Sequence, residues 1–163
     1  GDYYLGVELY EVTDLDGQQY ALAWHAVIET ATLLWTGAID DAWDIDGTAN
    51  WSQASLPRQY TDGDHVIFND TAVAAPLIDL TATVNPGSVL VNNDAVNFEF
   101  GGAGSIAGSC GLTKNGAAML TIATSNTYTG DTRINAGTVT VAADGALGAG
   151  AVKLGDTTGS SDA

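Results

Sequence analysis

Residues Leu112 to Val141 read LTKNGAAMLTIATSNTYTGDTRINAGTVTV, and the fold follows from the pattern of this stretch. Within it, short apolar segments such as Leu120-Thr-Ile122 and Val139-Thr-Val141 alternate with turns rich in Gly, Asn and Asp. Each segment is too short to bury its own apolar face. If successive coils stack, the segments share one continuous core, and the pattern therefore predicts a β-solenoid.

The same pattern extends over residues 101–155, where Ser105-Ile106, Thr132-Arg-Ile134 and Val152-Lys-Leu154 recur at irregular spacing. We assign this range to the solenoid repeat region. Residues 35–100 contain short apolar runs separated by Asn, Asp, Gly and Pro, and these runs predict a β-rich capping or transition region. The last residues, 156–163, form a polar tail.

Residues 1–34 predict a β-hairpin, or part of a small β-sandwich, that either caps the solenoid or belongs to the tail of a preceding module. Apolar and polar residues alternate from Val7 to Val12, and a second alternating run, 18–29, follows the turn at Asp16-Gly17. An α-helix over 18–34 is the alternative, because this stretch is rich in Ala and Leu and lacks Gly and Pro. The start at Gly1, without a Met, favours a fragment of a longer polypeptide.

Composition supports an all-β protein. Of the 163 residues 45% are hydrophobic, and the 20 glycines favour turns over helix interiors. The net charge is −16, and the four basic residues, Arg58, Lys114, Arg133 and Lys153, lie far apart in the sequence. We therefore expect no basic patch and no binding to nucleic acid. No apolar run approaches the ~20 residues that span a bilayer, so direct membrane insertion is not expected.

Residues 112–141 resemble the autotransporter-associated β-strand repeat. The resemblance rests on Leu112-Thr-Lys-Asn-Gly116, on Leu120-Thr-Ile122 and on Asn126-Thr-Tyr-Thr-Gly-Asp-Thr-Arg-Ile134. Tyr128, Gly130, Thr132 and Gly137 stand at the family spacing, whereas Ala118 and Asp131 replace residues that are usually Gly. The upstream segments Trp35-Thr-Gly37 and Val66-Ile-Phe68 resemble the region that precedes such repeats in surface proteins of Planctomycetes and Verrucomicrobia.

This resemblance implies a right-handed β-helix in an exported passenger region, and it implies no catalytic chemistry. We therefore expect an extracellular or cell-surface protein, associated with an outer membrane, that is not an enzyme. The preferred function is structural, as a passenger stalk, a spacer or a subunit of an extracellular filament. Adjacent modules or identical subunits would be its partners, end to end, because unpaired end strands invite strand addition.

Three tryptophans, Trp35, Trp43 and Trp51, follow one another at even intervals in the sequence. Exposed indole faces would stack on sugar rings, so the alternative function is a carbohydrate-binding or adhesin module with glycans as partners. The competing interpretation is that these rings shield the end of the solenoid core, because a solenoid needs a cap and aromatic rings bury a large apolar area.

Four carboxylates, those of Asp40, Asp41, Asp44 and Asp46, lie close together and precede Gly47. Calcium takes six to eight oxygen ligands, and Asp-rich turns supply them. This loop is therefore the candidate calcium site, and no other cofactor is expected. The spacing is not that of an EF-hand, and Asp-Gly is also a common plain turn.

The remaining candidates for chemistry are weak. Cys110 is the only cysteine, which excludes an internal disulfide, and it is expected to be a small buried side chain. Neither His25 nor His65 has a His or Cys partner at metal-ligand spacing. Gly108-Ser-Cys-Gly111 looks like a nucleophile turn, but such a turn requires a following helix, which the pattern does not predict.

Overall fold

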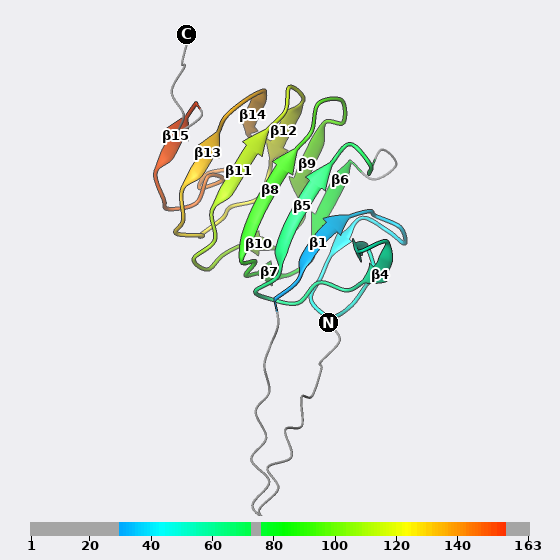
Figure 1. The fold of residues 1–163 in the computed structure, drawn as a ribbon. Helices are drawn as coiled ribbons and strands as arrows, with labels where there is room; N and C mark the ends of the chain where they lie inside the picture. Colours follow the sequence, from blue (N-terminus) through cyan, green and yellow to red (C-terminus); the bar gives the residue numbers. More distant parts are fainter. Residues whose placement is uncertain (1–29, 73–75, 156–163) are drawn as a thin grey trace, which may run out of the picture.

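The computed structural model describes residues 30–72 and 76–155, and the regular structure of these residues is entirely β-strand (Figure 1). Stacked parallel strands form a β-solenoid of about four turns, which confirms the predicted fold class. The strands are β1 (Thr32–Trp35), β2 (Ala42–Trp43), β3 (Trp51–Gln53), β4 (Leu56–Arg58), β5 (His65–Asn69), β6 (Leu77–Leu80), β7 (Thr83–Val84), β8 (Ser88–Asn92), β9 (Phe98–Gly101), β10 (Ser105–Ile106), β11 (Leu112–Asn115), β12 (Met119–Ile122), β13 (Thr132–Ile134), β14 (Thr138–Val141) and β15 (Val152–Leu154).

The largest sheet, which we call sheet A, contains one parallel strand from each successive coil together with the hairpin strands β3 and β4. Its order is β15-β13-β11-β8-β5-β1-β3-β4. The pairs from β1 to β15 are parallel, whereas β3 is antiparallel to both β1 and β4. In Figure 1 the strands β1, β5, β8, β11, β13 and β15 lie side by side with colours that run from blue to red, so the coils stack in sequence order.

Two further sheets complete the coils. Sheet B has the order β14-β12-β9-β6-β2, and sheet C contains only β10 and β7. All of their pairs are parallel. A coil thus runs from sheet A to sheet B, and the two coils that begin with β5 and β8 continue to sheet C before they return.

The strand register shows how long each coil is. In the first part of the stack Val66 pairs with Val89 and Val89 with Leu112, whereas further along Leu112 pairs with Thr132 and Thr132 with Val152. The coils therefore become shorter after β11. The apolar pairs in the sequence recur more often than the coils because each coil contributes two or three strands. The parallel stack also begins before residue 101, since β5, β6, β8 and β9 belong to it.

The interior consists of columns of side chains from successive coils. One column is Ile78, Phe100 and Ile122, which pair in register and are fully buried. Because side chains alternate along a strand, the intervening residues face outward. Such columns together give each coil a core that it could not form by itself, as in other repeat architectures.

Asparagines at the coil corners connect neighbouring coils. The buried Asn126 accepts a hydrogen bond from the Ile106 backbone N–H at 2.8 Å in the coil before, and its Nδ2 donates to the Ala146 carbonyl at 2.8 Å in the coil after. Asn93 Nδ2 donates to the Met119 carbonyl in the next coil at 3.1 Å. These side chains satisfy backbone groups that the strand ladders leave unpaired at the turns.

The N-terminal end of the stack is closed by an antiparallel hairpin. Strands β3 and β4 form it, with Gln53 opposite Leu56 and with Ala54 and Ser55 in the turn. The predicted β-hairpin of residues 1–34 and the helix considered for 18–34 lie almost entirely outside the described residues. From that range only 30–34 are described, and Thr32 to Leu34 belong to β1. No helix long and apolar enough to cross a membrane occurs in the described part of the chain.

Candidate functional site

The three tryptophans lie in the core and not on the surface. Trp35, Trp43 and Trp51 are at most 1% exposed. The Trp51 ring lies 4.9 Å from that of Trp35 and 5.3 Å from that of Trp43, edge to face in both cases. Phe68 and Tyr60 complete the cluster. Since other side chains cover these ring faces, no sugar can stack on them, and the basis for a tryptophan glycan platform is removed.

The tryptophans instead shield the core, which is the competing interpretation of their spacing. They occupy the end of the stack where β1, β2 and the β3–β4 hairpin meet. Trp43 also reaches Phe100 of a later coil, with ring centroids 6.1 Å apart. The indole N–H groups of Trp43 and Trp51 have no hydrogen-bond partner within the described residues. Burial of their large apolar area is therefore what these residues contribute.

The carboxylates of the acidic loop each bind protein groups of their own. Asp40 Oδ1 accepts hydrogen bonds from Asn50 Nδ2 at 2.6 Å and from the Ala42 backbone N–H at 3.0 Å, and the Asn50 contact lowers the pKa of Asp40. Both Asp44 oxygens accept from the Thr48 backbone N–H, at 2.9 and 3.0 Å. These carboxylates thus stabilise the turns in which they lie.

The remaining two acids do not complete a metal site. Asp46 Oδ1 accepts a hydrogen bond from Thr61 Oγ1 at 2.7 Å, and Asp41 is exposed. Across residues 30–72 and 76–155, no group of three or more His, Cys, Asp or Glu side chains is placed to hold a metal ion. The sequence places Asp40, Asp41, Asp44 and Asp46 close together, but the fold directs the oxygens of Asp40, Asp44 and Asp46 to separate donors.

Cys110 is buried, as the sequence predicts. Its Sγ donates to the Ala107 carbonyl at 3.5 Å, and burial raises the pKa of the thiol to about 11. A thiol that stays protonated at neutral pH is a poor nucleophile. After Gly108 and Ser109 the chain continues into β11 and not into a helix, so the geometry of a nucleophile elbow is absent from this turn.

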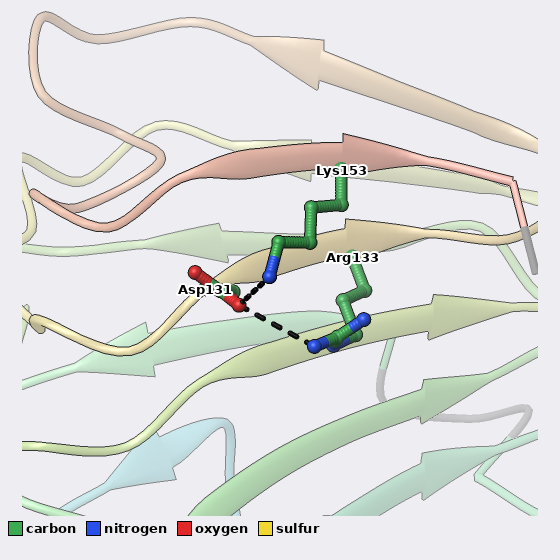
Figure 2. A network of polar contacts seen from close by, with 3 residues as sticks. All are labelled: Asp131, Arg133 and Lys153. Carbon is green, nitrogen blue, oxygen red and sulfur yellow. Dashed lines mark hydrogen bonds and ion pairs between the residues drawn. The ribbon is translucent and has the colours of Figure 1, made fainter. Parts of the chain in front are cut away.

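The structure brings together two basic residues that the sequence separates. Arg133 on β13 and Lys153 on β15 are register partners, because β15 follows β13 by one coil. Figure 2 shows both side chains directed at Asp131: Lys153 Nζ lies 2.5 Å and Arg133 Nη2 3.4 Å from Asp131 Oδ2. The Lys153 contact is the main cause of the lowered pKa of Asp131. The sequence predicts no basic patch, and the fold brings two of the four basic residues together around one carboxylate.

A hollow of about 420 Å³ lies beside this cluster on the outer face of sheet A. Two columns of outward residues border it: Leu90, Thr113 and Arg133 on one side, and Ser88 and Asp131 on the other. In the second column, the position between Ser88 and Asp131 is Gly111, which has no side chain. At its edge, Ser88 Oγ lies 2.8 Å from His65 Nδ1.

Sequence reasoning missed this site because its residues come from three coils. Ser88, Thr113 and Arg133 are neighbours only when the coil length is known, and the step from β8 to β11 is longer than that from β11 to β13. Lys114 was also missed: it is fully buried, and its Nζ donates to the Asn115 and Gly116 carbonyls at 2.6 and 2.7 Å. Period-two alternation, which puts Lys114 on the same face as Leu112, is the signal that identifies it.

Comparison with known proteins supports the repeat. The passenger-associated-transport-repeat family matches residues 112–141, which comprise β11, β12, β13 and β14 with the turns between them. Neither the comparison with curated proteins nor that with solved structures gave a match. The likeness of the upstream segments to surface proteins of particular bacterial groups stays a prediction. Residues 112–141 thus match the passenger-associated-transport-repeat family, which supports an autotransporter-associated repeat in this part of the chain.

Proposed function

We propose that this chain is a structural segment of an exported passenger, a spacer or stalk that holds other parts of the protein away from a cell surface. The observation that carries the proposal is the uninterrupted parallel stack from β1 to β15 in sheet A, which includes the matched repeat. Continuous backbone ladders along the long axis make such a rod stiff. The family match supports export to a surface, and the solenoid supports a structural function over a catalytic one.

Both ends of the stack have edge strands, β4 and β2 at one end and β15 and β14 at the other, but the two ends differ in what covers the core, and this difference gives the proposal a direction. The buried tryptophans and the β3–β4 hairpin close one end. At the other end, β15 pairs only with β13 and β14 only with β12 within the described residues. Val141, Val152 and Leu154 are exposed there, by 53%, 48% and 77%. Apolar side chains beside unpaired strand edges suit the stacking of a further coil, from an adjacent module or from an identical subunit.

Stacking at the β15 end can be tested by adding one more coil there. One variant carries a second copy of residues 136–155 directly after residue 155, which is one coil length at the register of β13 and β15. We expect a higher melting temperature with a single transition, because nearest-neighbour interfaces add stability in a repeat protein. A scrambled copy of the same segment is the matched control. Equal melting temperatures for the copied and scrambled variants would contradict the proposed stacking end.

Export is tested separately on cells that make the full protein. Intact cells are treated with a protease, and the protein that remains is then measured with antibodies raised against the purified chain. We expect the signal to be lost from intact cells while a cytoplasmic marker is retained. Retention of both signals would contradict exposure on the surface.

A further inference from the structure

Two of the residues that line the hollow on sheet A, Gly111 and Gly130, lie where neighbouring coils approach closely. A Cβ atom on Gly111 would lie 2.8 Å from the Asp131 carbonyl oxygen, and one on Gly130 would lie 2.2 Å from the Cys110 carbonyl oxygen. Real Cβ atoms do not approach backbone this closely, so both positions must lack a side chain. Gly111 and Gly130 therefore present only backbone to the hollow, among the outward residues of β8, β11 and β13. The hollow is an open surface depression with a volume of about 420 Å³.

The side chains around this floor offer a mixed set of contacts. Ser88 and Thr113 present hydroxyl groups, Asp131 presents acceptor oxygens, and Leu90 presents an aliphatic wall. A sugar has the same mixture, with hydroxyl groups around an edge and C–H groups on a face. Unlike the buried tryptophans, all four of these residues retain solvent access.

Arg133 adds a positive charge to the wall. Lys153 lies nearer to Asp131 than Arg133 does, 2.5 Å against 3.4 Å, and Lys153 does not line the hollow. Lys153 therefore makes the shorter contact with Asp131, and the Arg133 guanidinium, which has five N–H donors, keeps donors for a second acceptor. A planar guanidinium binds a carboxylate through two parallel hydrogen bonds.

We propose that this hollow binds a sugar carrying a carboxylate, with the carboxylate on Arg133, the hydroxyl groups on Ser88, Thr113 and Asp131, and the sugar C–H face against Leu90. We assign the ligand a single carboxylate because Arg133 is the one cationic residue among the described residues that line the hollow, and because a chain with a net charge of −16 repels polyanions at long range. This ligand class does not follow from the structural function of the rod. It would give one face of the rod the capacity to hold a surface glycan.

The test is a titration of the full chain with glucuronate, followed by ¹H–¹⁵N NMR. We expect saturable shifts of the Ser88, Leu90 and Thr113 amides. Substitution R133Q should weaken the affinity by about tenfold, the equivalent of losing one hydrogen bond to a charged group. R58Q is the matched control, since it removes the same charge from β4, away from the hollow, and it should bind as the unchanged chain does.

A second variant keeps the test independent of the folding of R133Q. Thr113→Phe fills the hollow with a side chain that suits a strand, and it should abolish the shifts while the rest of the spectrum stays folded. Absence of saturable shifts with glucuronate would overturn the proposal. So would equal binding of glucose, which lacks the carboxylate, or of acetate, which lacks the sugar. An equal loss in R133Q and R58Q would attribute binding to overall charge and would also overturn it.

Discussion

Among single residues, polar side chains connect one coil to the next. Asp70 is the clearest case, because its two oxygens accept hydrogen bonds from the backbone N–H groups of Asp94, Ala95 and Val96, at 2.8, 3.0 and 2.8 Å. These N–H groups, of which Val96 has the largest effect, lower the pKa of Asp70. Asp70 thus stabilises a turn of the next coil.

Substitution D70N should lower the melting temperature at neutral pH, because an amide cannot accept all three hydrogen bonds. The pKa of Asp70 is lower in the folded chain than the ordinary value of 3.8. The carboxylate therefore contributes fully to the free energy of unfolding above pH 3.8, and this contribution disappears as the pH falls through the folded pKa. Thermal melts from neutral pH downward check this. The two chains should converge in acid. D144N, at an exposed carboxylate, is the control and should melt like the unchanged chain.

Lys114 is a second residue that links stability to pH, and its charge is opposite to that of Asp70. Burial lowers the pKa of its ammonium from the ordinary value of 10.5. Between the two values the unfolded chain binds more protons, so stability should rise with pH in that window. K114M should remove this rise. It should also reduce the free energy of unfolding by about 1–3 kcal/mol, because the Asn115 and Gly116 carbonyls lose their donor. Denaturant titrations at several alkaline pH values measure both effects, and an unchanged pH slope in K114M would contradict the assignment.

At the level of strands and turns, a positive φ and close contact between coils restrict which residues a turn can contain. Gly116 has a φ of +78°, and a Cβ atom there would lie 2.1 Å from the Asn93 carbonyl oxygen of the preceding coil. Gly155 has a similar φ of +88°, but a Cβ atom on it would meet nothing within 4 Å. The two positions therefore separate backbone strain from close contact between coils.

Both G116A and G155A incur the left-handed backbone cost of about 1–2 kcal/mol. G116A should lose a further ~1–3 kcal/mol, because the coils must move apart to admit the methyl group. Urea unfolding of the two variants gives the comparison. Equal losses would mean that the close approach at Gly116 is not a constraint.

The β3–β4 hairpin has a turn that its residues do not favour. Ala54 and Ser55 have φ values of +50° and +65°. A two-residue turn with both φ values positive prefers Asn-Gly. Ser55→Gly should therefore raise the free energy of unfolding by about 1 kcal/mol, and Ala54→Asn should add to this. Ser52→Gly, on β3 itself, should do the reverse. Denaturant unfolding measures all three, and a fall in stability on Ser55→Gly would contradict the turn geometry.

For the molecule as a whole, we predict that stability comes from the stacking of coils and does not depend on a metal ion. The carboxylates of Asp40, Asp44 and Asp46 already accept hydrogen bonds from protein donors. We therefore expect the same melting temperature in excess EDTA and in millimolar calcium chloride. A calcium-dependent rise, retained at matched ionic strength, would contradict this expectation and would reinstate the acidic loop as a calcium site.

The class of fold and the matched repeat could be predicted from the local pattern of the sequence. Short apolar segments such as Leu120-Thr-Ile122, between Gly and Asn turns, cannot bury their apolar face alone, and the stacking of successive coils gives them a shared core. The same pattern could not give the coil length, because each coil contributes several strands and the coils become shorter after β11.

Which side chains meet became known from the three-dimensional structure. Trp35, Trp43 and Trp51 are buried at one end, although their spacing also suits an exposed platform. Arg133 and Lys153 come together across one coil, beside a hollow on three strands. The physical reason is that contacts between coils depend on register, and register is set by the complete packing of the core and not by any short stretch of the chain.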